Sequence, residues 1–283
     1  MEIAVGSQPS LWPSNSAEAH VAEVIAPGVV LLAVADGFGV VRGQTVAAVT
    51  VSAVRDALRR RVRHDTRDPR SHLMAAFSAA NARIFAQTGG TDDYVAGGTS
   101  LTAALIVDDR AYIAHVGKAR AYLCRDGALS ALTEDDALGG DDWVRARTLV
   151  PTEARTGNLL TRTLGTQATL EASVMHVRLM HADALILATG GVHEIVAGDE
   201  MTYTLQVAQS SSDVAGRLLE ILKMRGAPGG GTVIVGRALT EAATDEVPCL
   251  RPATMRTAAT VFAAILIMIL AATVVLRTVF VGP

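Results

Sequence analysis

The first 240 residues alternate short apolar runs with longer segments of helical character. The run 29–35 (VVLLAVA) is apolar throughout, which is typical of a buried strand, and the glycine-containing segment 36–39 predicts a turn after it. The alanine-rich segments 44–63 and 71–87 are long enough to form helices. Further strands are expected at 99–107, 111–116, 120–124, 172–179, 184–188 and 232–238, and a further helix at 213–224.

Short polar connections separate several of the expected strands. Asp108 and Asp109 stand between two of them, and Arg125, Asp126 and Gly127 follow a third. Such connections predict antiparallel hairpins. Antiparallel strands with adjacent helices predict an α+β sandwich for residues 1–240.

The C-terminal part of the chain has a different pattern. Residues 258–276 contain no charged side chain, and a helix of this length at about 1.5 Å per residue spans most of a hydrocarbon core of about 30 Å. We therefore expect a linker at 241–257, one transmembrane helix at 258–276 and a short tail at 277–283. Two arginines, Arg251 and Arg256, lie just before the span, and one, Arg277, follows it. The N-terminal residues show neither a basic leader nor an apolar signal segment. This predicts a single-pass protein of the cell membrane with its large N-terminal domain in the cytoplasm.

Composition excludes several classes of protein. The chain is 50% hydrophobic and 19% charged, which argues against disorder, and its net charge of -3 gives no general attraction to nucleic acid. Two cysteines, Cys124 and Cys249, cannot form a disulfide framework. The seven histidines show no zinc-binding spacing. No nucleic-acid partner is expected.

Five sequence blocks occur in an order that identifies a family. They are AVADGFGVVRGQTVA, GGTSLTAALIVDDRAYIAHVGKARAYLCRDGALSALTEDDAL, LLTRTLG, DALILATGGVHEIV and GGGTVIVGRA. In these blocks the chain resembles the metal-dependent protein phosphatase family (PPM-type, protein phosphatase 2C-like) over about residues 1–240. The resemblance implies two packed antiparallel sheets flanked by helices, with the site at one edge. It also implies protein-serine/threonine phosphatase activity with Mg²⁺ or Mn²⁺ as cofactor.

Few of the family's metal-binding positions keep a ligand here. The resemblance assigns Asp36 to the aspartate of the family's ADG motif, which makes it the one remnant of the catalytic centre, and Gly37 to a backbone carbonyl ligand. Glu18 is the one acid near the family's N-terminal acidic pair. Two divalent ions require several converging carboxylates to offset their charge. One or two carboxylates are too few.

The remaining family positions are degenerate. Lys118 stands where the family has the aspartate of GDSR, Gly190 where it has that of SDG, and Gly229 and Gly230 where it has the late DN pair. Glycine offers no side-chain oxygen, and Lys118 brings a positive charge that repels a cation. We expect no bound cofactor and no ordinary phosphatase activity.

Three functions follow from these observations. The first is a membrane-tethered pseudophosphatase that acts as a binding, scaffold or regulatory module in Ser/Thr phosphorylation signalling. Its protein partner would be a Ser/Thr kinase, a phosphoprotein or a regulator, and its C-terminal helix would bind the membrane. The second is an active but atypical metal-dependent protein-serine/threonine phosphatase that uses Asp36 with Mg²⁺ or Mn²⁺. The third is a structural or sensor subunit of a membrane assembly.

Several side chains near the expected site have open alternatives. Lys118 either forms an ion pair with Asp36 in place of a metal or is solvated, and with glycine-loop amides it could bind phosphate. A small shift of the loops would bring Asp199, Asp213 or Glu194 closer to the site.

Other conspicuous residues have plainer explanations. His115 is expected in the core or at a strand edge, and Asp183 in a structural turn. Asp135 and Asp136 are expected on a solvated loop with at most a weak cation site. The arginines of 55–70 are expected on a solvated helix face, with contact to anionic lipid as the alternative.

Overall fold

The computed structural model describes residues 1–9, 16–88, 97–137, 160–227 and 229–238, and Met1–Leu239 form one compact unit. The expected linker, transmembrane helix and tail lie outside the described residues, as do most of the polar residues that follow Asp136. Within the described ranges, no helix has both the length and the apolar character that a membrane span needs.

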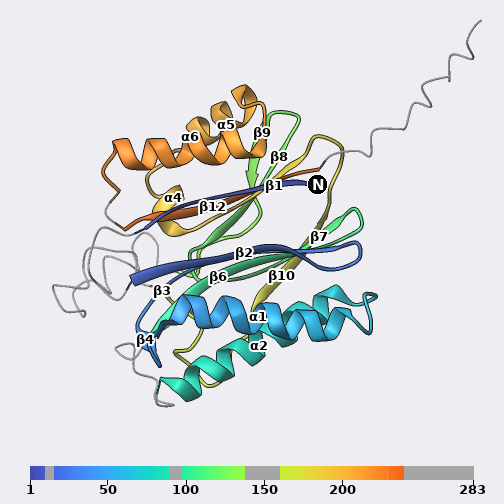
Figure 1. The fold of residues 1–283 in the computed structure, drawn as a ribbon, viewed down its shortest axis with the longest axis vertical. Helices are drawn as coiled ribbons and strands as arrows, with labels where there is room; N and C mark the ends of the chain where they lie inside the picture. Colours follow the sequence, from blue (N-terminus) through green and yellow to red (C-terminus); the bar gives the residue numbers. More distant parts are fainter. Residues whose placement is uncertain (10–15, 89–96, 138–159, 228, 239–283) are drawn as a thin grey trace, which may run out of the picture. The chain divides into compact units, whose positions relative to one another are not determined.

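Two five-stranded antiparallel sheets form the centre of the fold (Figure 1). One sheet has the order β1-β12-β11-β8-β9 and the other β10-β7-β6-β3-β2, and a small hairpin pairs β4 with β5. The strands of the first sheet are β1 (Glu2–Gln8), β12 (Gly231–Arg237), β11 (Ala184–Ala188), β8 (Arg120–Arg125) and β9 (Ala128–Ala131). Those of the second are β10 (Ser173–Arg178), β7 (Arg110–Val116), β6 (Gly98–Val107), β3 (Val29–Phe38) and β2 (Ser16–Ala26); the hairpin consists of β4 (Val40–Val41) and β5 (Gln44–Thr45).

Helices cover the outer face of each sheet (Figure 1). The β2–β3 sheet carries α1 (Val46–Val62) and α2 (Pro69–Gln87), while α4 (Gly190–His193), α5 (Gly198–Val207) and α6 (Ser211–Met224) lie against the other sheet. Capping side chains set the starts of the long helices, because Thr45, Asp68 and Ser210 each accept a hydrogen bond from a backbone N–H of the first turn.

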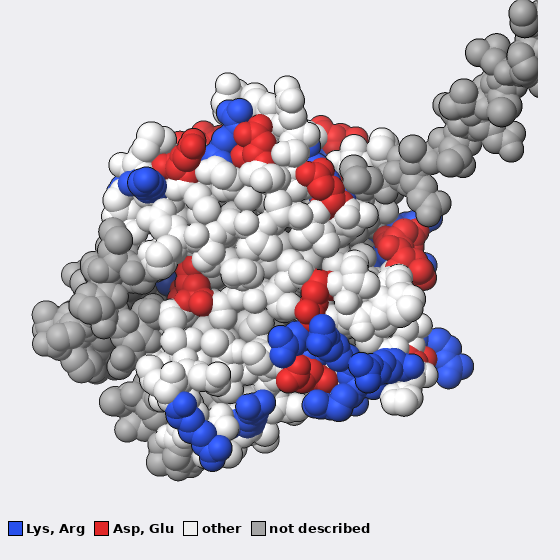
Figure 2. Space-filling view, viewed as in Figure 1, with Lys and Arg blue, Asp and Glu red and all other residues white. Residues whose placement is uncertain are grey.

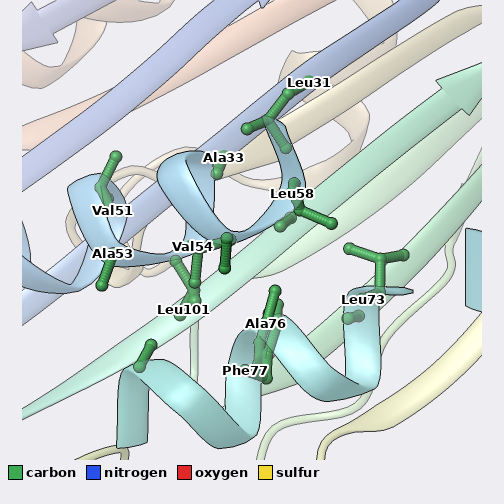
Figure 3. Close-up of a cluster of buried hydrophobic side chains, with 14 of the residues drawn as sticks. Leu31, Ala33, Val51, Ala53, Val54, Leu58, Leu73, Ala76, Phe77 and Leu101 are labelled. Carbon is green, nitrogen blue, oxygen red and sulfur yellow. The ribbon is translucent and has the colours of Figure 1, made fainter. Parts of the chain in front are cut away.

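Three hydrophobic layers hold the sandwich together. Leu31 and Leu101 pack against Phe77 of α2 beneath the β2–β3 sheet (Figure 3), and Leu32, Ile113 and Leu185 fill the space between the sheets. A third layer lies under α5 and α6. Alternate strand residues therefore face different layers, which explains why the central strands are apolar throughout.

The described residues confirm most of the expected elements, with one correction and several elements that were not expected, among them β9, α4 and α5. The predicted turn at 36–39 is wrong in its first part, since β3 continues to Phe38 in register with both neighbouring strands. Glycine at 37 allows β3 and β6 to approach closely, because a Cβ there would stand 2.7 Å from Thr99. The two N-terminal strands, β1 and β2, were not expected, although β2 carries part of the candidate site.

Candidate functional site

Two neighbouring strands bring the two candidate metal-binding carboxylates together. Glu18 of β2 is the direct partner of Asp36 of β3 in the antiparallel register. Their side chains therefore project from the same face of the sheet. Burial raises the pKa of Asp36, which Lys118 opposes by its charge. The sequence named both residues as candidate metal ligands but did not predict that they are neighbours on adjacent strands.

Threonine hydroxyls occupy both carboxylate oxygens of Glu18. Thr189 donates to Oε1 at 2.7 Å and Thr232 donates to Oε2 at 2.5 Å. The Thr232 hydroxyl also lies 2.9 Å from that of Ser7, and the Thr232 N–H donates to the Thr189 hydroxyl at 2.9 Å. Glu18 therefore connects the edge strand β2 of one sheet to β12 of the other sheet and to the residue that follows β11.

Sequence reasoning did not assign a role to these hydroxyl residues. Thr189 precedes the double glycine of the fourth block, and Thr232 follows the glycines of the fifth. A single threonine in a loop has no distinctive spacing. Only the packing of one sheet on the other makes Thr189 and Thr232 partners of the same carboxylate.

The Lys118 side chain lies over Gly190. A Cβ built on Gly190 would stand 2.6 Å from Lys118 Cε and 3.0 Å from its Nζ. The ammonium donates to Glu194 Oε1 at 3.2 Å, and the Lys118 main chain is held by Ser100 and His193. Lys118 thus fills space beside the position where an aspartate at 190 would begin.

Neither alternative for Lys118, an ion pair with Asp36 or a solvated side chain, matches the structure. Its ion-pair partner is Glu194 rather than Asp36, and its side chain is 28% exposed rather than solvated. Of the three acids that a loop shift could bring closer, only Glu194 reaches the site. Asp199 accepts a hydrogen bond from the Glu200 N–H in the first turn of α5, and Asp213 pairs with Arg217 on α6.

The residues present do not fit a binuclear metal centre. Asp36, Glu18 and Glu194 surround an ammonium group, and among the residues that the structure describes no three Asp, Glu, His or Cys side chains are placed to hold a metal ion. The glycines at the family's aspartate positions differ in the space beside them. A Cβ on Gly190 would meet the Lys118 side chain, whereas a Cβ on Gly229 would meet nothing within 4 Å. The geometry supports a carboxylate–lysine cluster rather than a cation site.

The Glu18 carboxyl gives the site a pH dependence. Burial raises its pKa to about 7, although the hydroxyls of Thr232 and Thr189 favour the charged form. The native state then holds this proton more tightly than the unfolded chain, whose value is near 4.5. Its contribution to stability is complete below that value and is lost as the pH rises through about 7.

We therefore expect Glu18→Gln to change how stability depends on pH. The amide cannot titrate, so the variant gains relative to the parent by up to about 3 kcal/mol as the pH rises from about 5 to about 8. Thermal unfolding of both proteins across this range measures the difference. Parallel curves for the parent and the variant would contradict the raised pKa.

The other residues named from the sequence lie away from this cluster. Asp183 is buried and accepts two hydrogen bonds from Arg125 and one from the Met180 N–H, and His115 is 2% exposed, which confirms a structural turn and a core position. Asp135 and Asp136 are not simply solvated, because each pairs with an arginine. Arginines of 55–70 gather on the surface near the α1–α2 connection (Figure 2), where three pair with acids.

Comparison with known proteins gives consistent matches. Residues 18–137 match the family model described as Protein phosphatase 2C. The chain is 31% identical over 215 residues to the serine/threonine protein phosphatase PstP of Mycobacterium tuberculosis, which covers 74% of this chain but only 40% of that protein. It is 28% identical over 221 residues to the serine/threonine phosphatase stp of Listeria monocytogenes, covering 76% of this chain and 87% of that one.

Solved structures share the fold described above. The crystal structure of the M. tuberculosis phosphatase PstP aligns with a TM-score of 0.66 at 28% identity, covering 84% of this chain and 98% of that one. A crystal structure of the catalytic domain of a serine/threonine protein phosphatase PstP in complex with two manganese ions aligns with the same TM-score and identity, over 84% of this chain and 97% of that one. By its two-sheet fold, its family-model match and these relatives, the chain belongs to the protein phosphatase 2C (PPM-type) family.

Proposed function

We propose that this chain is a pseudophosphatase of the PPM type. In this proposal it serves as a binding, scaffold or regulatory module in Ser/Thr phosphorylation signalling and does not itself hydrolyse phosphoproteins. Its protein partner is a Ser/Thr kinase, a phosphoprotein or a regulator of either, recognised by the retained sandwich.

One observation carries the proposal. The Lys118 side chain crosses over Gly190 and ends 3.2 Å from Glu194, so an ammonium group stands among the acids where the family resemblance implies divalent cations. A cation entering this cluster would be repelled by Lys118 and would have to displace the threonine hydroxyls from Glu18. These contacts support a site that is complete without metal.

We also propose that the domain is tethered to the cell membrane through the apolar segment 258–276. A single-pass anchor would hold the domain at the inner face of the cell membrane and raise its local concentration toward membrane-bound partners. Proteinase treatment of intact cells and of everted vesicles tests this orientation. Cleavage of the domain in intact cells would contradict it.

Titration with metal tests whether the chain has lost the metal binding that phosphatase activity needs. We expect calorimetric titration of Mn²⁺ and of Mg²⁺ into the full chain to give no saturable heat at roughly millimolar metal, the range of weak carboxylate sites. Asp36→Ala serves as the control and should behave like the parent chain. Saturable binding that Asp36→Ala abolishes would instead support an atypical active phosphatase, and hydrolysis of a phosphopeptide would then be measured.

A further inference from the structure

A group of arginines lies around the connection between α1 and α2, on the helices that cover the β2–β3 sheet (Figure 2). Residues 55–70 contain seven arginines and three aspartates, in a chain whose net charge is -3. The remaining residues therefore carry a net negative charge, and this end of the helical layer is positive. We call these side chains the arginine patch: Arg55, Arg59, Arg60, Arg61, Arg63, Arg67 and Arg70.

The arginine patch is only partly neutralised by acids. Three of its arginines each pair with a nearby carboxylate. The other four are exposed and have no ion pair among the residues that the structure describes; they are Arg60, Arg61, Arg63 and Arg70. Asp68 is the one acid of 55–70 outside these pairs, and it accepts a hydrogen bond from the Ser71 N–H as the cap of α2. The surface here therefore keeps an excess of positive charge.

The helix ends account for only some of these arginines. Arg59, Arg60 and Arg61 lie in the last turn of α1, where the negative end of the helix stabilises a cation. Arg70 lies in the first turn of α2, where the helix end is positive, and that turn contains no acid. The local fold thus disfavours the charge of Arg70, and a partner outside the fold is needed to stabilise it.

Two exposed apolar side chains border the arginine patch. Met74 is 40% exposed and lies one turn along α2 from Arg70, on the same face of the helix. Val24 is 67% exposed and follows Glu23, the partner of Arg59. A phospholipid surface matches both features, because guanidinium groups bind its phosphates and apolar side chains enter the interface. A nucleic-acid backbone would match the charge alone.

We propose that the arginine patch binds the anionic surface of a membrane, with its four unpaired arginines on lipid headgroups and Met74 and Val24 at the interface. The inference rests in part on the proposed tether. The apolar segment 258–276 would hold the domain near the bilayer without selecting the face that turns toward it. The arginine patch supplies that selection, since basic side chains are attracted to anionic lipid within about one Debye length of the surface.

The full chain with lipid vesicles tests the proposal, using an environment-sensitive fluorophore on an introduced cysteine. Thr66→Cys carries the label in the α1–α2 connection, and Ser212→Cys carries it on α6 as the matched control; both positions are exposed. Cys249 is replaced by serine in both proteins, and the buried Cys124 is kept. The vesicles contain phosphatidylcholine alone or equal amounts of phosphatidylcholine and phosphatidylserine.

The label at 66 is expected to report an apolar environment only with phosphatidylserine. Its emission should move to shorter wavelength in the mixed vesicles and stay unchanged in phosphatidylcholine. The shift should disappear at roughly 1 M salt, where the Debye length is about 3 Å. The label at 212 should not respond to either vesicle.

Two charge-reversal variants separate the arginine patch from the net charge of the chain. Glutamate at Arg60, Arg61 and Arg63 together should abolish the shift at 66, because each arginine near an anionic surface strengthens binding about fivefold and three give about 100-fold. Glutamine at the same positions should give the same loss without adding a negative charge to the end of α1. The control variant has glutamate at three exposed basic positions elsewhere and should keep the shift: Arg83, Arg217 and Lys223.

The proposed tether and the arginine patch can fail separately in this experiment. Flotation of the chain with phosphatidylcholine vesicles reports the tether, and the label at 66 reports the patch. Flotation without a shift at 66 in the mixed vesicles overturns the patch and keeps the tether. Flotation with the mixed vesicles alone, together with the shift, does the reverse.

Three further results would overturn the role of the arginine patch. They are equal shifts at 66 and 212, an unchanged shift in both arginine variants, and no flotation with either kind of vesicle.

Discussion

Replacing Lys118, Gly190 and Gly229 together by aspartate will give this chain a saturable Mn²⁺ site. The substitutions remove the ammonium that repels a cation and add three carboxylates near Asp36, at the positions that the family resemblance assigns to metal ligands. Aspartate at 190 has room once Lys118 Cε, 2.6 Å from its Cβ, is gone, and aspartate at 229 meets nothing within 4 Å. Calorimetry of the full chain should show binding at roughly 10⁻⁴ M or tighter, against none for the parent.

A matched triple variant separates added ligands from lost repulsion. Alanine at the same three positions removes Lys118 and fills the same space without adding oxygen ligands. It should bind no Mn²⁺ in the range where the aspartate variant saturates. Equal binding by both variants would mean that Lys118 alone excludes the metal. Failure of the folded aspartate variant to bind would show that these positions do not converge on Asp36.

Alanine at Gly191 will destabilise the domain far more than alanine at Gly190. A Cβ on Gly191 would stand 2.0 Å from the carbonyl oxygen of Gly230, so the backbone before β12 would have to move. A Cβ on Gly190 meets only the flexible end of Lys118. We expect a loss of about 3 kcal/mol or more for Gly191→Ala and about 1 kcal/mol or less for Gly190→Ala.

Urea unfolding of the two variants beside the parent chain measures this difference. Neither glycine has the positive φ that strains an alanine, so the comparison isolates the space around each Cβ. Adding Lys118→Ala should remove the cost of Gly190→Ala and leave that of Gly191→Ala unchanged. Similar losses at 190 and 191 would contradict the close approach of Gly191 to Gly230.

The sequence by itself determined the strands and helices whose pattern is local. Residues 184–188 form the strand expected from an unbroken apolar run, because a strand covered on both faces needs apolar side chains at every position. The helix predicted at 213–224 is confirmed, and in the structure it begins two residues earlier, after the capping Ser210. The order of five motifs likewise identified the family, since each motif is read from neighbouring residues.

Contacts between distant residues were decided only by the tertiary structure. Glu18 and Thr232 are 214 residues apart, and the hydrogen bond between them exists because one sheet packs on the other. The partner of Lys118 is Glu194, 76 residues away, and not Asp36, which was one of the two alternatives that the sequence left open; Glu194 directly follows α4. Hydrophobic periodicity records which face of a strand is buried but not which polar side chains meet across two sheets. For this chain, the sequence predicts that metal ligands are missing at Lys118, Gly190, Gly229 and Gly230, and only the fold shows that Lys118 pairs with Glu194.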